Sequence, residues 1–475
     1  MEDIKFGTDG WRGVIADDFT FENVSRVAQA IADYYKNKPD KKKGVVIGYD
    51  TRFLSKEFAE SVAEVLLGND IPVILSQTDI PTQAVSLAVV EKNLPGGVMI
   101  TASHNPPRFN GVKIKGPFGG PATPDITGKI ESMLDKNPIQ RLSWKEGEKR
   151  GLAKKENLIS SYLKKVTSFV DMKLINNARL KIVYDPMYGT GSGLLEEILS
   201  KSNCELVTIH PKYNPGFGGI NPEPIEENLW ELQKEVKSRG ADLGVATDGD
   251  SDRVGIVDET GRYLTTLQVF SLLLLYLAED KNMRGKVVKT VSLGYQPERI
   301  CRKFNLEYEQ TPVGFKYICD KMLKENVMFG GEESGGYGYR GYIPERDGLL
   351  SSLFFIEMIA RKGMPLSEIL ENMERKFGKS VFKRIDFEQE RKINKEKMVK
   401  ELISNPPVAL GGVPVKDILS IDGVKFIMED ESWLLVRPSG TEPKVRVYAE
   451  APKEKQLESI IQEGVSLAKE IISKI

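Results

Sequence analysis

Short runs of β-branched residues alternate with stretches of helical spacing through most of this chain. Apolar residues recur at helical intervals over Phe21–Tyr35 and Phe58–Leu67, whereas Gly44–Gly48 and Pro72–Leu75 are short runs built on valine, isoleucine and leucine. Strands that alternate with helices in this way form α/β units around a parallel or mixed sheet. Ligands of such sheets bind at the carboxyl ends of the strands. Functional residues are therefore expected just after each apolar run.

The alternation restarts twice. Lys181–Asp185 opens a second series that ends with Asp242–Thr247, and Lys286–Val291 opens a third after the helical stretch Thr266–Leu277. Each restart predicts another α/β domain, because a new strand–helix series needs a core of its own.

The C-terminal part has a different pattern. Trp433–Val436 and Lys444–Tyr448 are expected to be two strands joined by a loop, and an amphipathic helix follows them. The 475 residues also exceed the ~250–300 that a single core usually reaches. We predict an α/β fold of three similar α/β domains with mixed sheets, followed by a smaller α+β domain. The expected domains are residues 1–155, 156–262, 263–382 and 383–475.

Composition excludes several classes of partner. The net charge is −1, from 67 basic and 68 acidic residues, so no field favours nucleic acid or an anionic membrane. The start of the chain lacks a signal-peptide pattern, and the longest apolar run, Phe270–Leu277, is too short to span a bilayer. Cys204, Cys301 and Cys319 have no metal-type spacing and predict buried thiols in the cytoplasm. Oligomeric state is not predicted.

A serine follows the third run of the first series. Thr101–Pro106 comes directly after Gly97–Ile100 and places the hydroxyl of Ser103 beside His104, one of only two histidines. A serine hydroxyl needs a base, a cation or prior phosphorylation to take part in group transfer. The alternative is a simple turn, since Ser, Asn and Pro are common in turns. Lys113 is either a nearby positive charge or an exposed lysine.

Asp248, Asp250 and Asp252 alternate directly after the run that ends at Thr247. Three carboxylates this close repel one another unless a cation offsets their charge. Mg²⁺ is the expected ion, because it binds a few carboxylates together with a phosphate oxygen. The alternative is a solvated acidic turn. Arg253, which follows, either binds a phosphate oxygen or neutralises its aspartate neighbours.

An EF-hand is excluded for the same segment. That loop requires glycine at its sixth position, where this chain has Arg253. The flanks Leu243–Ala246 and Val254–Val257 also have the composition of strands and not of helices.

Two later loops carry polar groups on a glycine-rich backbone. Glu332 and Ser334 lie in Gly330–Gly336, where glycines let the backbone approach a ligand closely. The other loop offers a guanidinium fork, hydroxyls and backbone amides for an anion, with Arg446 a few residues on. The alternatives are a glycine-rich turn and a plain hairpin. The residues of the second loop are Arg437, Ser439, Gly440 and Thr441.

These four motifs, together with Phe6–Gly13, resemble those of the α-D-phosphohexomutase superfamily, the phosphoglucomutases and phosphomannomutases. Their order and separation match over nearly the whole chain. The resemblance implies four domains around one central cleft. It also implies a phosphoserine enzyme that depends on Mg²⁺.

The resemblance assigns a role to each motif. Ser103 would be the phosphoserine, and its phosphate would complete the coordination of Mg²⁺. His104 would orient a phosphate, Arg12 and Lys113 would flank the reacting phosphate, and Lys316 in Thr311–Tyr317 would be an acid/base or phosphate contact. The metal ligands would be Ser103, Asp248, Asp250 and Asp252. Substrate would be bound by Arg253, Glu332, Ser334, Arg437, Ser439, Gly440, Thr441 and Arg446.

The implied reaction interconverts glucose 1-phosphate and glucose 6-phosphate through glucose 1,6-bisphosphate. Mannose-type and glucosamine-type members usually carry a histidine where this chain has Gly336, so glucose is the expected sugar. The alternatives are a phosphomannomutase or an enzyme that uses both sugars. A Mg²⁺-dependent sugar phosphatase, which would use the same metal loop but release phosphate to water, is a less favoured alternative. A non-catalytic sugar-phosphate sensor is also less favoured, because a sensor needs neither a nucleophile nor a metal loop. The expected partners are hexose phosphates, with no nucleic acid or membrane.

Overall fold

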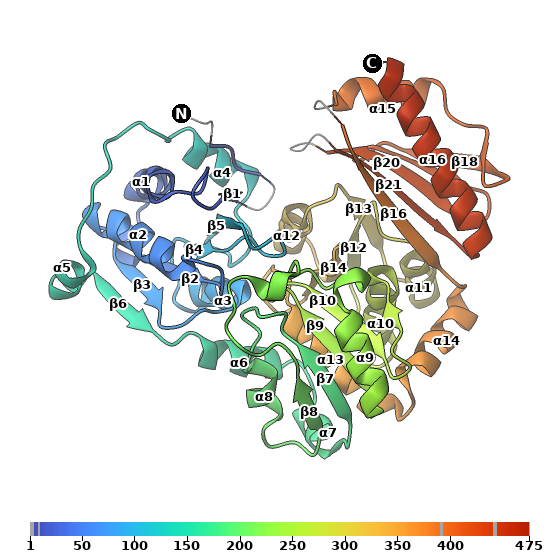
Figure 1. Ribbon diagram of the computed structural model, residues 1–475, viewed down its shortest axis with the longest axis horizontal. Helices are drawn as coiled ribbons and strands as arrows, with labels where there is room; N and C mark the ends of the chain where they lie inside the picture. The colour runs from blue at the N-terminus through green and yellow to red at the C-terminus, as the bar shows by residue number, and fades with distance from the viewer. Residues whose placement is uncertain (1–3, 8–9, 390–392, 440–443, 475) are drawn as a thin grey trace. The chain divides into compact units, whose positions relative to one another are not determined.

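The computed structural model describes residues 4–7, 10–389, 393–439 and 444–474 (Figure 1). The chain forms two compact units. The first consists of residues 1–264, 319–327 and 334–367, and the second of residues 265–318, 328–333 and 368–475. Among the described residues, no helix combines the length and the apolar character needed to cross a membrane.

The first sheet has six strands in the order β1-β5-β4-β2-β3-β6. Strands β4, β2, β3 and β6 are parallel, with β6 at one edge of the sheet, whereas β5 runs antiparallel to both β4 and β1. The strands are β1 Trp11–Val14, β2 Val45–Tyr49, β3 Val73–Ser76, β4 Gly97–Ile100, β5 Phe109–Lys115 and β6 Ala153–Glu156. The helices of this region are α1 Phe21–Lys36, η1 Lys41–Lys43, α2 Ser55–Gly68, α3 Thr82–Glu91, α4 Pro124–Glu131 and α5 Trp144–Lys149.

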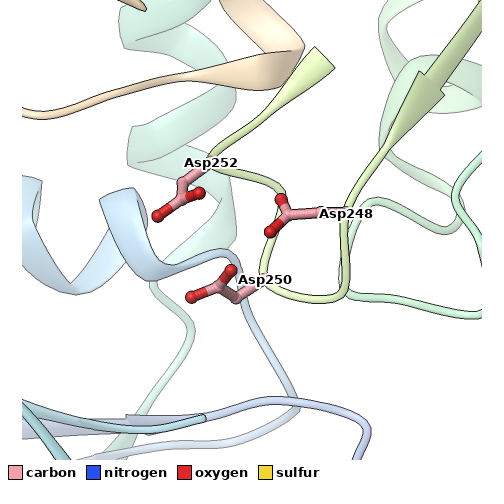
Figure 2. A group of neighbouring side chains, drawn as sticks. All are labelled: Asp248, Asp250 and Asp252. Atoms are coloured by element: carbon pink, nitrogen blue, oxygen red, sulfur yellow. The ribbon is translucent and has the colours of Figure 1, made fainter. Parts of the chain in front are cut away.

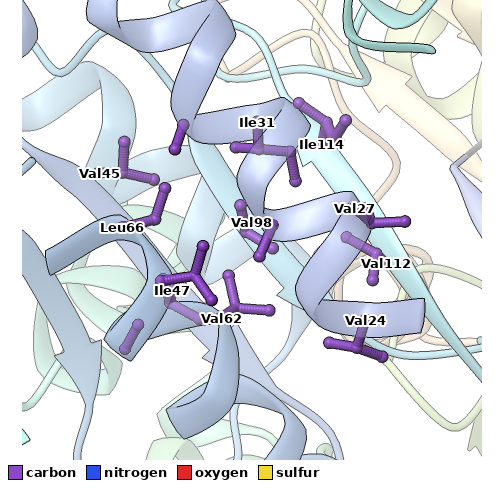
Figure 3. Packing of buried hydrophobic residues seen from close by; sticks show 14 of the residues in the cluster. Val24, Val27, Ile31, Val45, Ile47, Val62, Leu66, Val98, Val112 and Ile114 are labelled. Atoms are coloured by element: carbon purple, nitrogen blue, oxygen red, sulfur yellow. The ribbon is translucent and has the colours of Figure 1, made fainter. Parts of the chain in front are cut away.

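Helix α1 forms because its sequence supplies both a cap and an apolar face. The Thr20 hydroxyl accepts a hydrogen bond from the Asn23 amide at 3.2 Å, which satisfies one of the free amides of the first turn. Val27 and Ile31 of α1 lie against Val112, Ile114 and Val98 of the sheet, and Ile47 lies beside Val62 of α2 (Figure 3). Helix α3 packs on the other face of the sheet, where Val85 and Val89 approach Gly97.

The second sheet has the order β11-β10-β9-β7-β8. Strands β8, β7 and β9 are parallel, and β10 returns antiparallel to β9. The strands are β7 Lys181–Asp185, β8 Glu205–Thr208, β9 Leu243–Thr247, β10 Val254–Asp258 and β11 Tyr263–Leu264. The helices are α6 Ile159–Thr167, α7 Met172–Asn177, α8 Leu194–Leu199, η2 Phe217–Gly219, η3 Glu226–Asn228 and α9 Trp230–Arg239. The acidic loop therefore connects β9 to β10.

The third sheet has four strands in the order β13-β12-β14-β15. The strands are β12 Lys286–Thr290, β13 Tyr308–Thr311, β14 Val327–Gly331 and β15 Tyr337–Tyr339. The helices are α10 Thr266–Glu279, α11 Gln296–Phe304, α12 Phe315–Lys324, α13 Gly348–Lys362 and α14 Leu366–Phe377. Helix α10 begins with a capping box, in which the Thr265 hydroxyl and the Gln268 side chain each satisfy the other residue's amide.

The fourth sheet is antiparallel, with the order β16-β21-β20-β19-β18-β17. Helix α16 buries Leu457, Ile460 and Ile461 against it. The strands are β16 Val381–Glu388, β17 Ala409–Leu410, β18 Val413–Leu419, β19 Val424–Met428, β20 Trp433–Pro438 and β21 Lys444–Ala451. The helices are α15 Lys395–Ser404 and α16 Glu454–Lys474. The predicted C-terminal hairpin and amphipathic helix are confirmed, as is the α/β fold class with mixed sheets.

Ile31→Ala should loosen the core of the first sheet, because Ile31 is fully buried on the face of α1 that packs against the strands. The expected loss is ~2–5 kcal/mol, the usual cost of removing a buried isoleucine side chain. Hydrogen exchange of the β2 and β4 amides measures this loss locally. Ile139→Ala is the control, since Ile139 is 41% exposed. Equal exchange rates in the two variants would contradict the packing.

Candidate functional site

The Ser103 loop and the acidic loop meet in the first compact unit. The Ser103 hydroxyl donates a hydrogen bond to Asp248 Oδ2 at 2.8 Å, although 145 positions separate the two residues. Ser103 is 1% exposed and has a φ of +53°, a left-handed conformation that serine rarely adopts. Thr101 holds this turn, because its hydroxyl accepts from the Ser103 amide at 2.8 Å. The hydroxyl is thus directed at the acidic loop.

The three aspartates of the acidic loop face one another (Figure 2). Ligand oxygens of Asp248, Asp250 and Asp252 all lie within 4.8 Å of one another, and the three side chains are fully buried. Burial, together with the charges of the other two carboxylates, raises the pKa of Asp248 well above its ordinary value. A divalent cation would relieve that repulsion.

Two basic side chains already offset part of this charge. Lys113 Nζ lies 2.8 Å from Asp250 Oδ2 and 3.3 Å from Asp252 Oδ2. An Arg346 nitrogen lies 2.7 Å from Asp252 Oδ2. The other oxygen, Asp252 Oδ1, has no hydrogen bond among the described residues, and Arg253 Nε is 4.0 Å from it. This unsatisfied buried oxygen, with the other carboxylates and the Ser103 hydroxyl, makes a set of hard oxygen donors that fits Mg²⁺.

His104 and Arg12 lie beside the serine. His104 Nδ1 is 3.4 Å from Ser103 Oγ, and an Arg12 nitrogen donates to Asn105 Oδ1 at 2.6 Å. Burial and the nearby guanidinium of Arg253 hold the pKa of His104 well below its ordinary value. This direction favours the neutral imidazole, whose Nδ1 lies beside the Ser103 hydroxyl.

Arg52 is a site residue that the sequence did not single out. Its guanidinium donates to the carbonyls of Ser103, Asn105, Pro106 and Phe109 at 2.6, 2.6, 2.9 and 3.0 Å. It is 1% exposed and lies 3.2 Å from Asp50. Arg52 could have been suspected from the sequence because it comes just after the run that forms β2, at the carboxyl edge of the sheet, where ligands of such sheets bind.

Glu223 is a second residue that sequence reasoning missed. Its carboxylate accepts from an Arg253 nitrogen at 2.9 Å and lies 3.9 Å from His104 Nε2. The backbone amide of Arg253 in turn donates to Asp248 Oδ1 at 3.0 Å. Glu223 therefore fixes the guanidinium that follows the acidic loop.

The loop between β14 and β15 contributes to both compact units. Ser334, in the first unit, has a buried hydroxyl without a hydrogen bond among the described residues. Glu332, in the second unit, is 5% exposed. Its neighbour Glu333 accepts from the hydroxyls of Thr290 at 3.1 Å and Ser292 at 2.6 Å. The Glu333 carboxylate is thus bound by hydroxyl groups of the second unit, to which Glu333 itself belongs.

The remaining predicted residues belong to the second unit. Arg437 Nε donates to Asp422 Oδ2 at 2.7 Å, and Arg446 Nε donates to Asp386 Oδ2 at 3.4 Å. Arg437 and Arg446 are paired across β20 and β21, so both guanidinium groups are on one face of the sheet. The Ser439 amide donates to the Lys444 carbonyl at 2.8 Å. Gly440 and Thr441 lie outside the described residues.

Two further basic residues of the second unit, Arg384 and Lys316, are relevant to the predicted binding of phosphate. Arg384, which the sequence did not single out, pairs with Asp386 at 2.6 Å and lies over the Tyr448 ring. Lys316 is in α12, and burial lowers its pKa.

Arg52→Met should release the Ser103 loop. The change leaves Asp50 buried without its guanidinium and removes the donor from four carbonyls, a loss of ~3–5 kcal/mol for a broken buried pair. Hydrogen exchange over residues 101–110 should accelerate strongly, and the melting temperature should fall. Arg150→Met is the matched control, because Arg150 pairs with Glu146 at the surface. A wild-type exchange pattern in Arg52→Met would refute the anchoring role.

Comparison with known proteins identifies the same family over most of the chain. The family models for phosphoglucomutase/phosphomannomutase match in order: alpha/beta/alpha domain I at residues 3–141, domain II at 160–261, domain III at 267–377 and the C-terminal domain at 383–466.

Relatives and solved structures extend the match. The chain is 30% identical to a phosphoglucomutase/phosphomannomutase of Thermococcus kodakarensis over 98% of this chain and 99% of the relative. It is 34% identical to a probable phosphoglucosamine mutase of Methanosphaera stadtmanae over 96% of each. The crystal structure of a putative phosphomannomutase from Thermus thermophilus superposes with a TM-score of 0.86 at 32% identity, covering 98% of this chain and 99% of that one. The chain therefore belongs to the phosphoglucomutase/phosphomannomutase family.

Proposed function

We propose that the protein interconverts glucose 1-phosphate and glucose 6-phosphate through a phosphorylated Ser103 and a glucose 1,6-bisphosphate intermediate. The observation that carries this proposal is the 2.8 Å hydrogen bond from the Ser103 hydroxyl to a cluster of three buried aspartates. A serine in that position is next to a candidate cation site, and a cation beside the hydroxyl would assist phosphoryl transfer to and from it.

Two phosphoryl transfers make up the reaction. In the first, the bond between phosphorus and the Ser103 oxygen breaks while a bond to the sugar hydroxyl forms. The proton of the sugar hydroxyl leaves, and the Ser103 oxygen ends as a hydroxyl. In the second, the other phosphoryl group of the bisphosphate passes to Ser103 by the reverse of these steps. The bisphosphate has to turn over within the site between the two transfers.

The residues of the first unit would carry the transfer itself. Arg12 and Lys113 would hold the phosphoryl oxygens, and His104 would accept or return the proton. Arg253, fixed by Glu223, would bind a phosphate oxygen. Mg²⁺ held by Asp248, Asp250, Asp252 and the Ser103 oxygen would offset the negative charge that gathers on the transferring group.

The residues of the second unit would hold the rest of the substrate. Glu332 would accept hydrogen bonds from sugar hydroxyls, as would Ser334 of the first unit. Arg446 would support the anion loop, and Lys316 would be an acid/base or phosphate contact, since a lysine with a lowered pKa exchanges protons more readily near neutral pH. The anion loop consists of Arg437, Ser439, Gly440 and Thr441.

Organisation and location follow the same reasoning. We place the domains at residues 1–155, 156–262, 263–382 and 383–475, each with one of the four sheets as its main body. Cys204, Cys301 and Cys319 are free thiols, which suits a reducing cytoplasm. The partners would be hexose phosphates.

Mutase turnover should require Ser103 and a divalent cation. Purified protein should convert glucose 1-phosphate to glucose 6-phosphate in a coupled assay with catalytic glucose 1,6-bisphosphate, and peptide mapping should find phosphate on Ser103. Ser103→Ala and excess chelator should each abolish turnover, and Mg²⁺ should restore the chelated enzyme. Steady release of inorganic phosphate would favour a sugar phosphatase, and binding without turnover would favour a sensor. Full activity of Ser103→Ala would exclude the phosphoserine route.

Glucose phosphates should be preferred over mannose and glucosamine phosphates. The sugars differ at carbon 2, so selectivity depends on a few polar contacts. Gly336 supports glucose, because a Cβ at this position would lie 2.4 Å from Arg346 Cδ and a histidine would not fit unless Arg346 moved. The comparison is the ratio of kcat/KM for the three 1-phosphates. Equal values, or a higher value for mannose or glucosamine, would overturn the choice of sugar but leave the mutase assignment intact.

A further inference from the structure

Arg346 fills the space that a side chain at position 336 would need. A Cβ on Gly336 would lie 2.4 Å from Arg346 Cδ, 2.9 Å from Cγ and 3.4 Å from Cβ. The aliphatic part of Arg346 therefore passes directly over the glycine. Both residues belong to the first compact unit.

The other end of Arg346 reaches the acidic loop. Its guanidinium lies 2.7 Å from Asp252 Oδ2, and its side chain is 7% exposed. A single side chain thus spans from the backbone of the sugar loop, Ser334–Gly336, to a carboxylate of the candidate cation site.

Backbone contacts join the same segments. The Val254 amide, just after the acidic loop, donates to the Gly335 carbonyl at 3.0 Å. The Gly348 amide donates to the Ser251 carbonyl at 3.0 Å. Position 348 has no room for a side chain, because its Cβ would lie 2.3 Å from the Arg253 carbonyl oxygen. Residues 335–336 and 346–348 therefore pack directly against residues 251–254.

We propose that Gly336 and Arg346 act as one unit that fixes the acidic loop to the sugar loop. Arg346 is a positioning residue for Asp252, and residue 336 is glycine because the stem of Arg346 crosses it. This proposal rests on the proposed function for its cation site. It extends that function by making residue 336, which is not among the proposed cation ligands, a determinant of how the site holds a cation.

The physical consequence is a specific dependence between two positions. A methyl group at 336 requires the Arg346 stem to shift, and a shifted stem carries the guanidinium away from Asp252. If the Arg346 stem is absent, the two contacts shorter than 3 Å are gone, and the nearest remaining contact of the same methyl group is Arg346 Cβ at 3.4 Å or an atom farther away, an ordinary contact distance. Gly336→Ala should therefore disturb the acidic loop when Arg346 is present and leave it unchanged when residue 346 is alanine.

A double-mutant cycle tests this dependence in the full-length protein. Wild type, Gly336→Ala, Arg346→Ala and the double variant are compared by hydrogen exchange of peptides covering residues 248–254, without added metal. The dissociation constant for Mn²⁺, used as the probe cation, is measured by titration calorimetry. Gly128→Ala is the matched control, because nothing lies within 4 Å of the position its Cβ would take.

Gly336→Ala should change both the exchange rate and the Mn²⁺ dissociation constant by about fivefold or more in the wild-type background, a coupling of ordinary size for residues in contact. In the Arg346→Ala background both changes should fall below about twofold. Equal changes in the two backgrounds, or none in either, would overturn the proposal.

The two readouts separate this proposal from the proposed function. If Mn²⁺ does not bind, the cation site of the proposed function fails, whereas the exchange cycle still decides the link between Gly336 and Arg346. If the enzyme is an active mutase but the exchange effects are additive, only the link fails. If an alanine variant does not fold, as judged by circular dichroism, Gly336→Ser and Arg346→Met replace the two alanine variants. The proposal is then judged by the same fold-changes in exchange rate and Mn²⁺ dissociation constant, with Gly128→Ala as the control.

Discussion

Mutual repulsion among three buried carboxylates is the constraint on which the first compact unit depends. Asp248, Asp250 and Asp252 have oxygens within 4.8 Å of one another and no access to solvent. Charge of that density in a protein interior is unfavourable without positive partners. The surroundings supply them in Lys113 and Arg346, and leave one Asp252 oxygen unsatisfied for a cation. Much of the neighbouring structure can be understood as the support that holds these charges together.

The nucleophile depends on a different kind of support. Ser103 adopts a left-handed backbone that costs free energy. Arg52 stabilises it through hydrogen bonds to four carbonyls of the same loop. The same arginine forms an ion pair with Asp50 at the end of the neighbouring parallel strand. The strained serine is thus held through Arg52 by the central parallel strands of the sheet, which keeps its hydroxyl directed at Asp248.

The sequence predicted the elements better than the contacts. The alternation of apolar runs and helical stretches was enough for the α/β class, and the position of Ser103 after a strand predicted its place at the sheet edge. Lys113 shows the limit of this reasoning, since it is 1% exposed and bound to Asp250, whereas the sequence left an exposed surface lysine open as an alternative. Arg52, Glu223 and Arg346 were not identified, because each acts through partners distant in sequence or through carbonyls. Only Arg52 had a signal in the sequence, its position just after a strand, and that position does not reveal which carbonyls it binds. The assignment of roles in the second unit remains a prediction.

The order of the segments in the first unit has a consequence for synthesis on the ribosome. The acidic loop is translated well before Gly335, Arg346 and Gly348, which pack against it and come after β14 of the third sheet. A nascent chain that has emerged only as far as Leu264 contains all three aspartates but lacks the guanidinium beside Asp252. Until the later segment arrives, Lys113 can offset part of the charge of Asp250 and Asp252, but the contribution of Arg346 is missing. Completion of this unit is therefore a late event in the life of the growing chain, although its nucleophile and carboxylates are made much earlier.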